Sequence, residues 1–266
     1  MSFFGQAFMF DSTPCEMFDL MMYDVGDQDE DIQVGGGMEI EDEVIGDHWR
    51  PYFYGVKTGD KLEFDIVFGV NERRIRLGKF LDRWELEHVA SWLTGHTAYK
   101  MLFIDQPDAR TFGYRCMITD LKVTQYGAVP WALKAHVTCD SSYAYLEPVT
   151  YSFQVNGSKE VEVYNESSLN QLYHPVITIT KTGGSAFSIK NAQDNNRGPE
   201  LTDIPASVTT ITMDCEHCIL RSDQDLNLYS GFNFEFLGLA KGLNVLTLTG
   251  TGRMAITCEY PVNIGG

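Results

Sequence analysis

Alternation of apolar and polar residues with a period of two constrains this chain more than any other feature of its sequence. In KLEFDIVFGV, residues 61–70, apolar side chains at every second position fall on one face and charged side chains fall on the other. PWALKAHVTCD at 130–140 and VTYSFQV at 149–155 repeat the pattern. HPVITITKT, FSIKN, VTTITMD, NVLTLTG and RMAITCEY are short, rich in β-branched residues and bounded by Gly, Asn or Pro. This spacing predicts a mainly β fold of antiparallel sandwiches or barrels.

One segment, DRWELEHVASWLTG at residues 82–95, has the helical period instead. Asp82 is suited to the N-cap, and Glu85 completes a capping box three residues later. An apolar stripe then follows at positions 86, 89, 90 and 93. Gly95 is expected to end the helix in the left-handed conformation. This is the only helix that the sequence predicts, and we expect it to cover one sheet of an N-terminal domain.

The length of the chain predicts two domains. At roughly 150 residues for a domain, 266 residues can fold around two separate cores. Hydrophobic residues make up 44% of the chain, which is typical of a globular protein. Pro148 interrupts two strand-like runs in YAYLEPVTY. We therefore place the domains at residues 1–147 and 148–266.

The net charge of −17 is concentrated in the first fifth of the chain. Residues 1–49 hold 13 of the 37 acidic residues and no Lys or Arg, whereas the remaining 24 acidic residues are nearly balanced by 20 basic ones. Residues 23–47 are expected to form a long loop or a mobile hairpin. Such a surface repels phosphate, so nucleic-acid binding is disfavoured. A wall past which DNA slides and a solvated loop that aids solubility both remain open.

The start of the chain, MSFFGQAFMFDSTP, has neither the basic nor the long apolar region of a signal peptide. No stretch approaches the roughly 18 apolar residues of a membrane span. We therefore expect the protein to fold in a cytoplasm, with its six cysteines present as thiols.

The motif CEHC places Cys215 and Cys218 at the spacing used by zinc sites and by thiol–disulfide enzymes. A structural zinc site needs a second pair of ligands, and the other four cysteines are single and widely spaced. A redox pair needs a helix N-terminus, whereas ITMD and ILRS on either side have strand character. We interpret the motif as two thiols that flank a tight turn.

No other motif predicts chemistry. Asp27, Asp29 and Asp31 alternate as in a calcium-binding loop, but the Gly and Glu that such a loop needs are replaced by Ile32 and Met38. The glycines at 35–37 lack the Lys-Ser/Thr of a phosphate-binding loop, and there is no GxSxG elbow. We expect no catalytic residue, no metal site and no cofactor.

The order of the segments resembles the distal tail (Dit) proteins of long-tailed, siphovirus-type bacteriophages. FDSTPCEMFDLMM is similar to the opening motif of that family, with Asp11 and Ser12 in place of Asn-Gly, Cys15 in place of Ser, and Asp19 in place of Gly. KLEFDIVF, WELEHVASWL, AYKMLFIDQPD and HVTCDSSYAYLEP then follow in the family's order. In the second half, HPVITIT, ITMDCEHC and KGLNVLTLTG match family segments, with Lys241 where Pro is usual.

The resemblance implies an N-terminal β-sandwich-like domain with one α-helix, which forms a ring, and a C-terminal galectin-like β-sandwich that decorates the outside of the ring. It implies a homo-oligomer, expected to be a hexamer, in the baseplate or tail tip of the virion, assembled in the host cytoplasm. The implied partners are the tail-tube protein, the tail-tip hub or tail-associated lysin protein and, in some relatives, a receptor-binding protein. DNA passes through the channel without being bound, and no membrane is involved.

The acidic residues of the N-terminal stretch are the candidate channel or interface residues: Asp29, Glu30, Asp31, Glu41, Asp42 and Glu43. The alternative function is a carbohydrate-binding adhesion module of a phage or cell surface, because some galectin-like sandwiches hold sugars. The absence of Trp from residues 148–266 argues against that alternative, because sugars stack on exposed aromatic rings. A cell-wall hydrolase is a third reading, for which the sequence offers no site.

Overall fold

A computed structural model of the protein describes residues 7–23, 38–46, 48–58, 61–105, 112–126 and 129–263. The chain divides into two compact units, residues 1–146 with 263–266, and residues 147–262. Each unit has its own antiparallel sheet, and the described helices are few, so the predicted mainly β class is confirmed.

The N-terminal unit is built on one antiparallel sheet. Its strands follow the order β2-β1-β7-β8-β9-β6-β3, with β10 beside β8. Their bounds are Phe8–Phe10 (β1), Thr13–Pro14 (β2), Leu20–Met22 (β3), Glu63–Val70 (β6), Lys100–Ile104 (β7), Phe112–Tyr126 (β8), Val129–Cys139 (β9) and Ala144–Leu146 (β10). The predicted alternation holds in β6, where Phe64, Ile66 and Phe68 are buried. A short 3₁₀ helix, η1, spans Cys15–Phe18.

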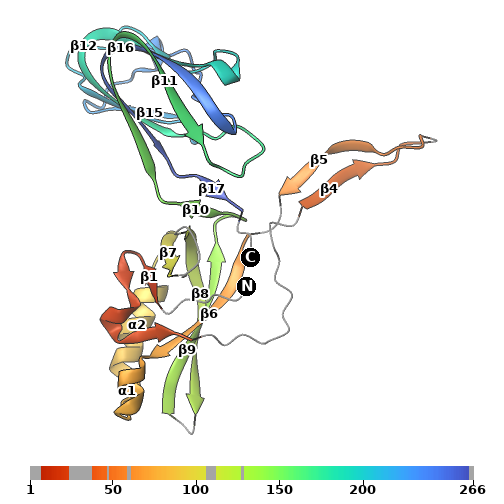
Figure 1. Ribbon diagram of the computed structural model, residues 1–266, viewed down its shortest axis with the longest axis vertical. Helices are drawn as coiled ribbons and strands as arrows, with labels where there is room; N and C mark the ends of the chain where they lie inside the picture. The colour runs from red at the N-terminus through yellow and green to blue at the C-terminus, as the bar shows by residue number, and fades with distance from the viewer. Residues whose placement is uncertain are drawn as a thin grey trace. The chain divides into compact units, whose positions relative to one another are not determined.

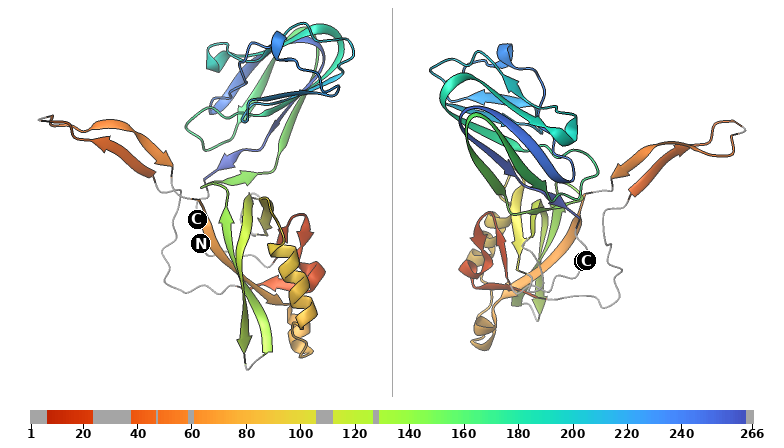
Figure 2. Two further views of the ribbon diagram at one scale, coloured as in Figure 1. Left: turned by 180° about the vertical axis from the view of Figure 1, so that it is seen from behind. Right: turned by 45° about the horizontal axis from the view of Figure 1, so that its top comes forward.

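Helix α2, Arg83–Thr94, packs on one face of this sheet (Figures 1 and 2). The predicted capping box between Asp82 and Glu85 is present. Trp92 fixes the helix to β1, because its ring stacks on Phe8 at 5.7 Å and its indole N–H donates to the carbonyl oxygen of Phe10 at 3.2 Å. The expectation for Gly95 is wrong, since its φ is −76°.

The prediction of a single helix is also wrong. Helix α1, Glu72–Arg76, follows β6 and begins at Asn71, whose side-chain oxygen accepts from the backbone N–H of Arg74 at 3.0 Å. The helix has five residues and buries none of them, so it has no apolar stripe that could reveal it in the sequence.

Three departures from the family's opening motif occupy left-handed backbone positions. Asp11 and Ser12, with φ of 49° and 64°, form the turn between β1 and β2, and Asp19, with φ of 53°, ends η1. The family has Asn-Gly and Gly there, which adopt positive φ more easily than Asp or Ser. In this chain, Asp11, Ser12 and Asp19 therefore adopt positive φ without the glycines of that motif.

The C-terminal unit is built on a six-stranded antiparallel sheet in the order β11-β16-β12-β14-β15, with β13 beside β12. The bounds are Val149–Asn165 (β11), Val176–Asn191 (β12), Glu200–Leu201 (β13), Thr210–Asp214 (β14), Ile219–Ser222 (β15) and Gly242–Cys258 (β16). The short strand Pro261–Val262 (β17) follows β16 and is not part of this sheet. Two 3₁₀ helices, η2 (Ala192–Asp194) and η3 (Tyr229–Gly231), interrupt the loops.

In two cases, a pair of short strands predicted from the sequence forms a single long strand in the structure. HPVITITKT and FSIKN both belong to β12, and NVLTLTG and RMAITCEY both belong to β16. The pairing of these strands shifts register around Gly183, and Figure 2 shows the long strands curving. At Gly252, with φ of 158°, a Cβ atom would lie 2.3 Å from the carbonyl oxygen of Thr180. The glycines that suggested chain breaks therefore permit irregular pairing and close contact.

Candidate interaction surfaces

The predicted acidic residues fall partly on a separate hairpin. Glu41, Asp42 and Glu43 lie on β4 (Met38–Glu43), which pairs with β5 (Tyr52–Thr58) in its own two-stranded sheet. Asp29, Glu30 and Asp31 lie outside the described residues. Residues 23–47 were predicted to form a loop or hairpin, and their described part from 38 onward belongs to this hairpin. We call residues 38–46 and 48–58 the arm.

The arm exposes apolar side chains. Phe53 is 65% exposed and Ile40 is 63% exposed. The other exposed large apolar residues of the arm are Val44, Ile45, Trp49, Tyr52 and Tyr54. A two-stranded hairpin has no core of its own, so these side chains can be covered only by something outside it.

Each face of the arm combines an acidic group with an aromatic ring. Across the two strands, Asp42 lies opposite Phe53 and Glu43 lies opposite Tyr52. The hydroxyl group of Tyr54 donates to the carboxylate of Glu43 at 3.4 Å. Asp42 and Glu43 are exposed, and Glu41 is half-buried. The arm therefore presents negative charge and apolar area together.

A second exposed surface lies at residues 72–84, which we call the corner. Its backbone is held by Arg74, whose guanidinium donates to the carboxylate of Glu85 at 2.8 Å and to the carbonyl oxygen of Phe80 at 2.9 Å. The hydrogen bond from Arg74 lowers the pKa of the Glu85 carboxyl group, and the same bond raises the pKa of Arg74. Arg74 is thus committed to the internal structure of the corner.

The remaining side chains of the corner combine positive charge with apolar area. Trp84 is 66% exposed and Leu77 is 62% exposed, and Ile75 and Phe80 are exposed as well. Five of the 20 basic residues of the chain fall within residues 72–83. The exposed basic residues are Arg73, Arg76, Lys79 and Arg83. Within the described part of the chain, Arg76 pairs with Glu72, whereas the other three form no ion pair.

An open groove of about 510 Å³ runs between α2 and strands β8 and β9. Arg83 and Leu86 line it from the helix, and Asp120, Val123 and Leu133 line it from the strands. Because Arg83 belongs to both, the groove continues the surface of the corner.

The C-terminal unit presents an aromatic ring on the loop after η3. Phe234 is 67% exposed, has a φ of 59° and stacks on Tyr229 at 5.9 Å. A bulky residue rarely adopts positive φ, so the surrounding structure must hold it there.

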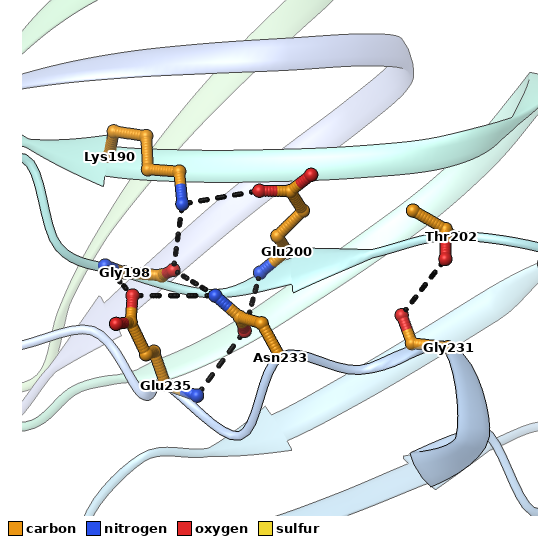
Figure 3. Close-up of polar contacts among 7 residues, drawn as sticks. All are labelled: Lys190, Gly198, Glu200, Thr202, Gly231, Asn233 and Glu235. Carbon is orange, nitrogen blue, oxygen red and sulfur yellow. Dashed lines mark hydrogen bonds and ion pairs between the residues drawn. The ribbon is translucent and has the colours of Figure 1, made fainter.

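Polar contacts fix this loop against β13 (Figure 3). Asn233 donates to the carbonyl oxygen of Gly198 at 3.0 Å and accepts from the backbone N–H of Glu200 at 3.0 Å. The carboxylate of Glu235 accepts from the N–H of Gly198 at 3.2 Å, and Lys190 pairs with Glu200 at 3.3 Å. These bonds hold the backbone on both sides of Phe234.

The CEHC motif lies at the turn between β14 and β15, as the sequence predicts. The thiol of Cys215 is buried, and burial raises its pKa to about 12, which opposes formation of a thiolate. Cys218 is exposed and has a φ of 56°. The ring of His217 bonds to the carboxylate of Asp214 at 2.9 Å, and the backbone N–H of His217 donates to the same carboxylate at 3.0 Å, so His217 stabilises the turn.

Among the described residues, no group of three or more His, Cys, Asp or Glu side chains is placed to hold a metal ion. None of the described helices combines the length and the apolar character needed to cross a membrane.

Comparison with known families decides the identity of the chain. Residues 3–141 match the family described as the phage tail protein N-terminal domain, which is more than half of the chain. The chain belongs to this family of phage tail proteins. Residues 143–258 of the tail protein match a second family, the phage tail C-terminal domain.

Solved structures share the fold. The crystal structure of Dit from phage SPP1 matches with a TM-score of 0.63 and 11% identity, over 96% of this chain and 98% of that one. Two structures of the phage P2 baseplate in its activated conformation, with Ca and with Sr, match at 9% identity over 90% of each chain, with TM-scores of 0.43 and 0.42. A comparison with curated protein sequences finds no match. The resemblance to the Dit proteins is thus confirmed for the fold.

Proposed function

We propose that this tail protein is a structural component of the tail tip that forms a hexameric ring joining the tail tube to the tail-tip hub. The observation that carries the proposal is the likeness in fold to SPP1 Dit over nearly the whole of both chains. SPP1 Dit is described as a paradigm of the hub adsorption apparatus in phages that infect Gram-positive bacteria. A role in the same apparatus follows for this chain by analogy of fold.

In this proposal residues 1–147 form the ring and residues 148–266 decorate its outside. The tail-tube protein binds one face of the ring, and the hub or tail-associated lysin protein binds the other, with receptor-binding proteins attached at the periphery. DNA passes through the channel without being bound. The protein is assembled in the host cytoplasm, works at the tail tip of the virion and catalyses no reaction.

The exposed arm supports self-assembly. A ring of identical subunits needs two different surfaces on each copy, one of which fits the other on the next copy. The apolar and charged surfaces of the arm and the corner provide two such surfaces on one chain.

The acidic residues of the arm serve either the channel or a subunit interface. Neutralising Glu41, Asp42 and Glu43 to Gln, Asn and Gln distinguishes the two roles. If their charge repels DNA in the channel, rings still form and genome ejection becomes slower. If their charge holds an interface, the variant assembles less well.

Electron microscopy of the purified tail protein with its tail tube tests the proposal. Closed rings with a central hole that cap one end of the tube are expected. Tubes that stay uncapped in the presence of excess tail protein would contradict it.

A second candidate function has support from one observation. Phe234 offers an exposed aromatic ring between two polar residues of the chain, Asn233 and Glu235, and a carbohydrate-binding adhesion module needs a ring on which a sugar can stack. Glycan arrays probed with the unmodified protein and with Phe234→Ala test this function. Glycan binding that disappears in the variant supports it, and absence of binding by the unmodified protein excludes it for the glycans present.

A further inference from the structure

The two exposed surfaces of the N-terminal unit are opposite in charge. Residues 38–58 contain five acidic residues and two basic ones, whereas residues 72–83 contain five basic residues and two acidic ones. Each surface also exposes large apolar side chains, such as Phe53 on the arm and Trp84 at the corner. Apolar area bordered by complementary charge is typical of protein interfaces.

We infer that the arm of one copy docks on the corner of a neighbouring copy of this chain. In the contact, the face of the arm that carries Asp42 and Phe53 lies on the corner. The carboxylate of Asp42 faces the cations of Arg73, Lys79 and Arg83, and the ring of Phe53 covers apolar side chains of the corner. This inference rests on the proposed self-assembly and names the pair of surfaces that performs it.

The corner is organised to receive a partner. Arg74 is already bonded to Glu85 and Phe80, so the backbone of the corner is fixed before docking. Arg73, Lys79 and Arg83 keep their charges available, because none pairs with a described carboxylate. A fixed surface loses little conformational freedom on binding, which favours association.

Between two copies of the chain, contact of an arm with a corner is more favourable than contact of an arm with an arm. Two arms placed together would set acid against acid, which costs several kcal/mol at an interface. A contact between an arm and a corner joins two different surfaces. Every copy carries both surfaces and can therefore bind one neighbour through each. Such a heterologous contact, repeated from copy to copy, closes into a ring when its rotation divides a full turn, as the proposed function requires.

Charge reversal tests the contact in both directions. One variant carries Glu41→Lys, Asp42→Lys and Glu43→Lys on the arm, and the other carries Arg73→Glu, Lys79→Glu and Arg83→Glu at the corner. Each alone is expected to raise the concentration needed for assembly by about tenfold or more, because like charges then face each other. Mixed in equal amounts, the two variants should assemble again, because each reversed arm meets a reversed corner on the other variant.

The matched control reverses three exposed cations of the C-terminal unit, Lys159→Glu, Arg221→Glu and Lys241→Glu. It changes the net charge by the same amount as the corner variant and should assemble like the unmodified chain. Circular dichroism of every variant verifies that the β structure is retained.

Carbodiimide crosslinking of the unmodified protein gives a direct readout. The reagent joins an amine to a carboxylate in contact with it, so Lys79 should be joined to Asp42. With ¹⁴N- and ¹⁵N-labelled chains mixed before assembly, the crosslinked peptides should carry one label each, which identifies two copies.

The outcomes separate this inference from the proposed function. If the unmodified chain forms rings and the corner variant forms them equally well, or if mixed-label crosslinks to Lys79 are absent, the arm–corner contact is wrong while the ring stands. If the unmodified chain forms no assembly with or without its tail tube, the proposed function is wrong and the contact with it.

Discussion

The side-chain amide of Asn191 donates to the side-chain oxygen of Asn244 at 3.0 Å, although the two residues are far apart in the sequence and both are fully buried. Asn244 also accepts from the N–H of Ala240 at 2.8 Å and donates to its carbonyl oxygen at 2.7 Å. Asn244 is the Asn of the KGLNVLTLTG segment, and its position explains why a polar side chain is needed there: it ties the loop before β16 to the end of β12.

The substitution Asn244→Leu should therefore lower the free energy of unfolding by about 3 kcal/mol, because it leaves several buried polar groups without partners. Urea unfolding followed by circular dichroism measures the change. Asn156→Leu, at an exposed position of β11, is the control and should change stability by less than about 0.5 kcal/mol. Equal midpoints for the two variants would show that the bonds of Asn244 contribute nothing.

The pairing of Glu85 with Arg74 should make stability depend on pH. The folded-state pKa of Glu85 is lowered from 4.5, so its contribution is complete above that value and is lost as the pH falls through the lowered pKa. Unfolding midpoints measured from neutral pH down to pH 3 should fall less steeply for Glu85→Gln than for the unmodified chain. At neutral pH the variant should be less stable by about 1 kcal/mol. Glu87→Gln, exposed on the same helix, should follow the unmodified chain.

Ser12→Gly should stabilise the N-terminal unit. Ser12 has a φ of 64°, where glycine is favoured by about 1 kcal/mol before its greater freedom in the unfolded chain is subtracted. A gain of about 0.5 kcal/mol is expected in thermal unfolding. Thr13→Gly, in the adjacent strand β2, should lower stability instead. A loss of stability in both variants would contradict the role of Ser12 in the turn.

The cysteines should differ sharply in reactivity. Of the six thiols, Cys218 is exposed and the other five are buried. A thiol reagent at neutral pH is expected to modify one cysteine for each native chain and six in denaturant, and Cys218→Ser should remove the native reaction. Rapid modification of Cys215 in the native chain, or zinc that co-purifies with the two thiols, would contradict the interpretation of CEHC as a turn and would favour a redox or zinc site.

The arm should contribute to assembly and not to the stability of the single chain. Phe53 is largely exposed, so Phe53→Ser should change the free energy of unfolding of the dilute protein by less than about 0.5 kcal/mol. The same variant should assemble poorly, because its apolar contact with the partner is lost. Phe68→Ala, at a fully buried position of β6, should cost about 3–5 kcal/mol and provides the contrast.

The sequence predicts those elements whose signal is local. Helix α2 follows from Asp82, Glu85 and its apolar stripe, and β6 follows from the alternation of Phe64, Ile66 and Phe68. Helix α1 buries no residue and so leaves no pattern. The bends of β12 and β16 depend on contacts made across the sheet, as at Gly252, and glycine alone is equally compatible with a turn.

The candidate surfaces, too, could be predicted only where the sequence carries a local signal. The acidic character of the arm is visible as charge, so Glu41, Asp42 and Glu43 could be singled out from the sequence. The exposure of Phe53 could not, because an aromatic residue in a strand is expected to be buried. The basic residues of the corner, such as Lys79, were missed because the chain as a whole is acidic, although their clustering within residues 72–83 could have revealed them.

The mass of the purified protein in solution, measured over a wide range of concentrations, tests the central claim most directly. Association of the 30.0 kDa chain through fitted, unlike surfaces predicts one discrete assembly of about six chains that gives way to single chains on dilution, with no series of larger species. A protein that stays a single chain at every concentration, including after addition of its tail tube, would contradict the claim.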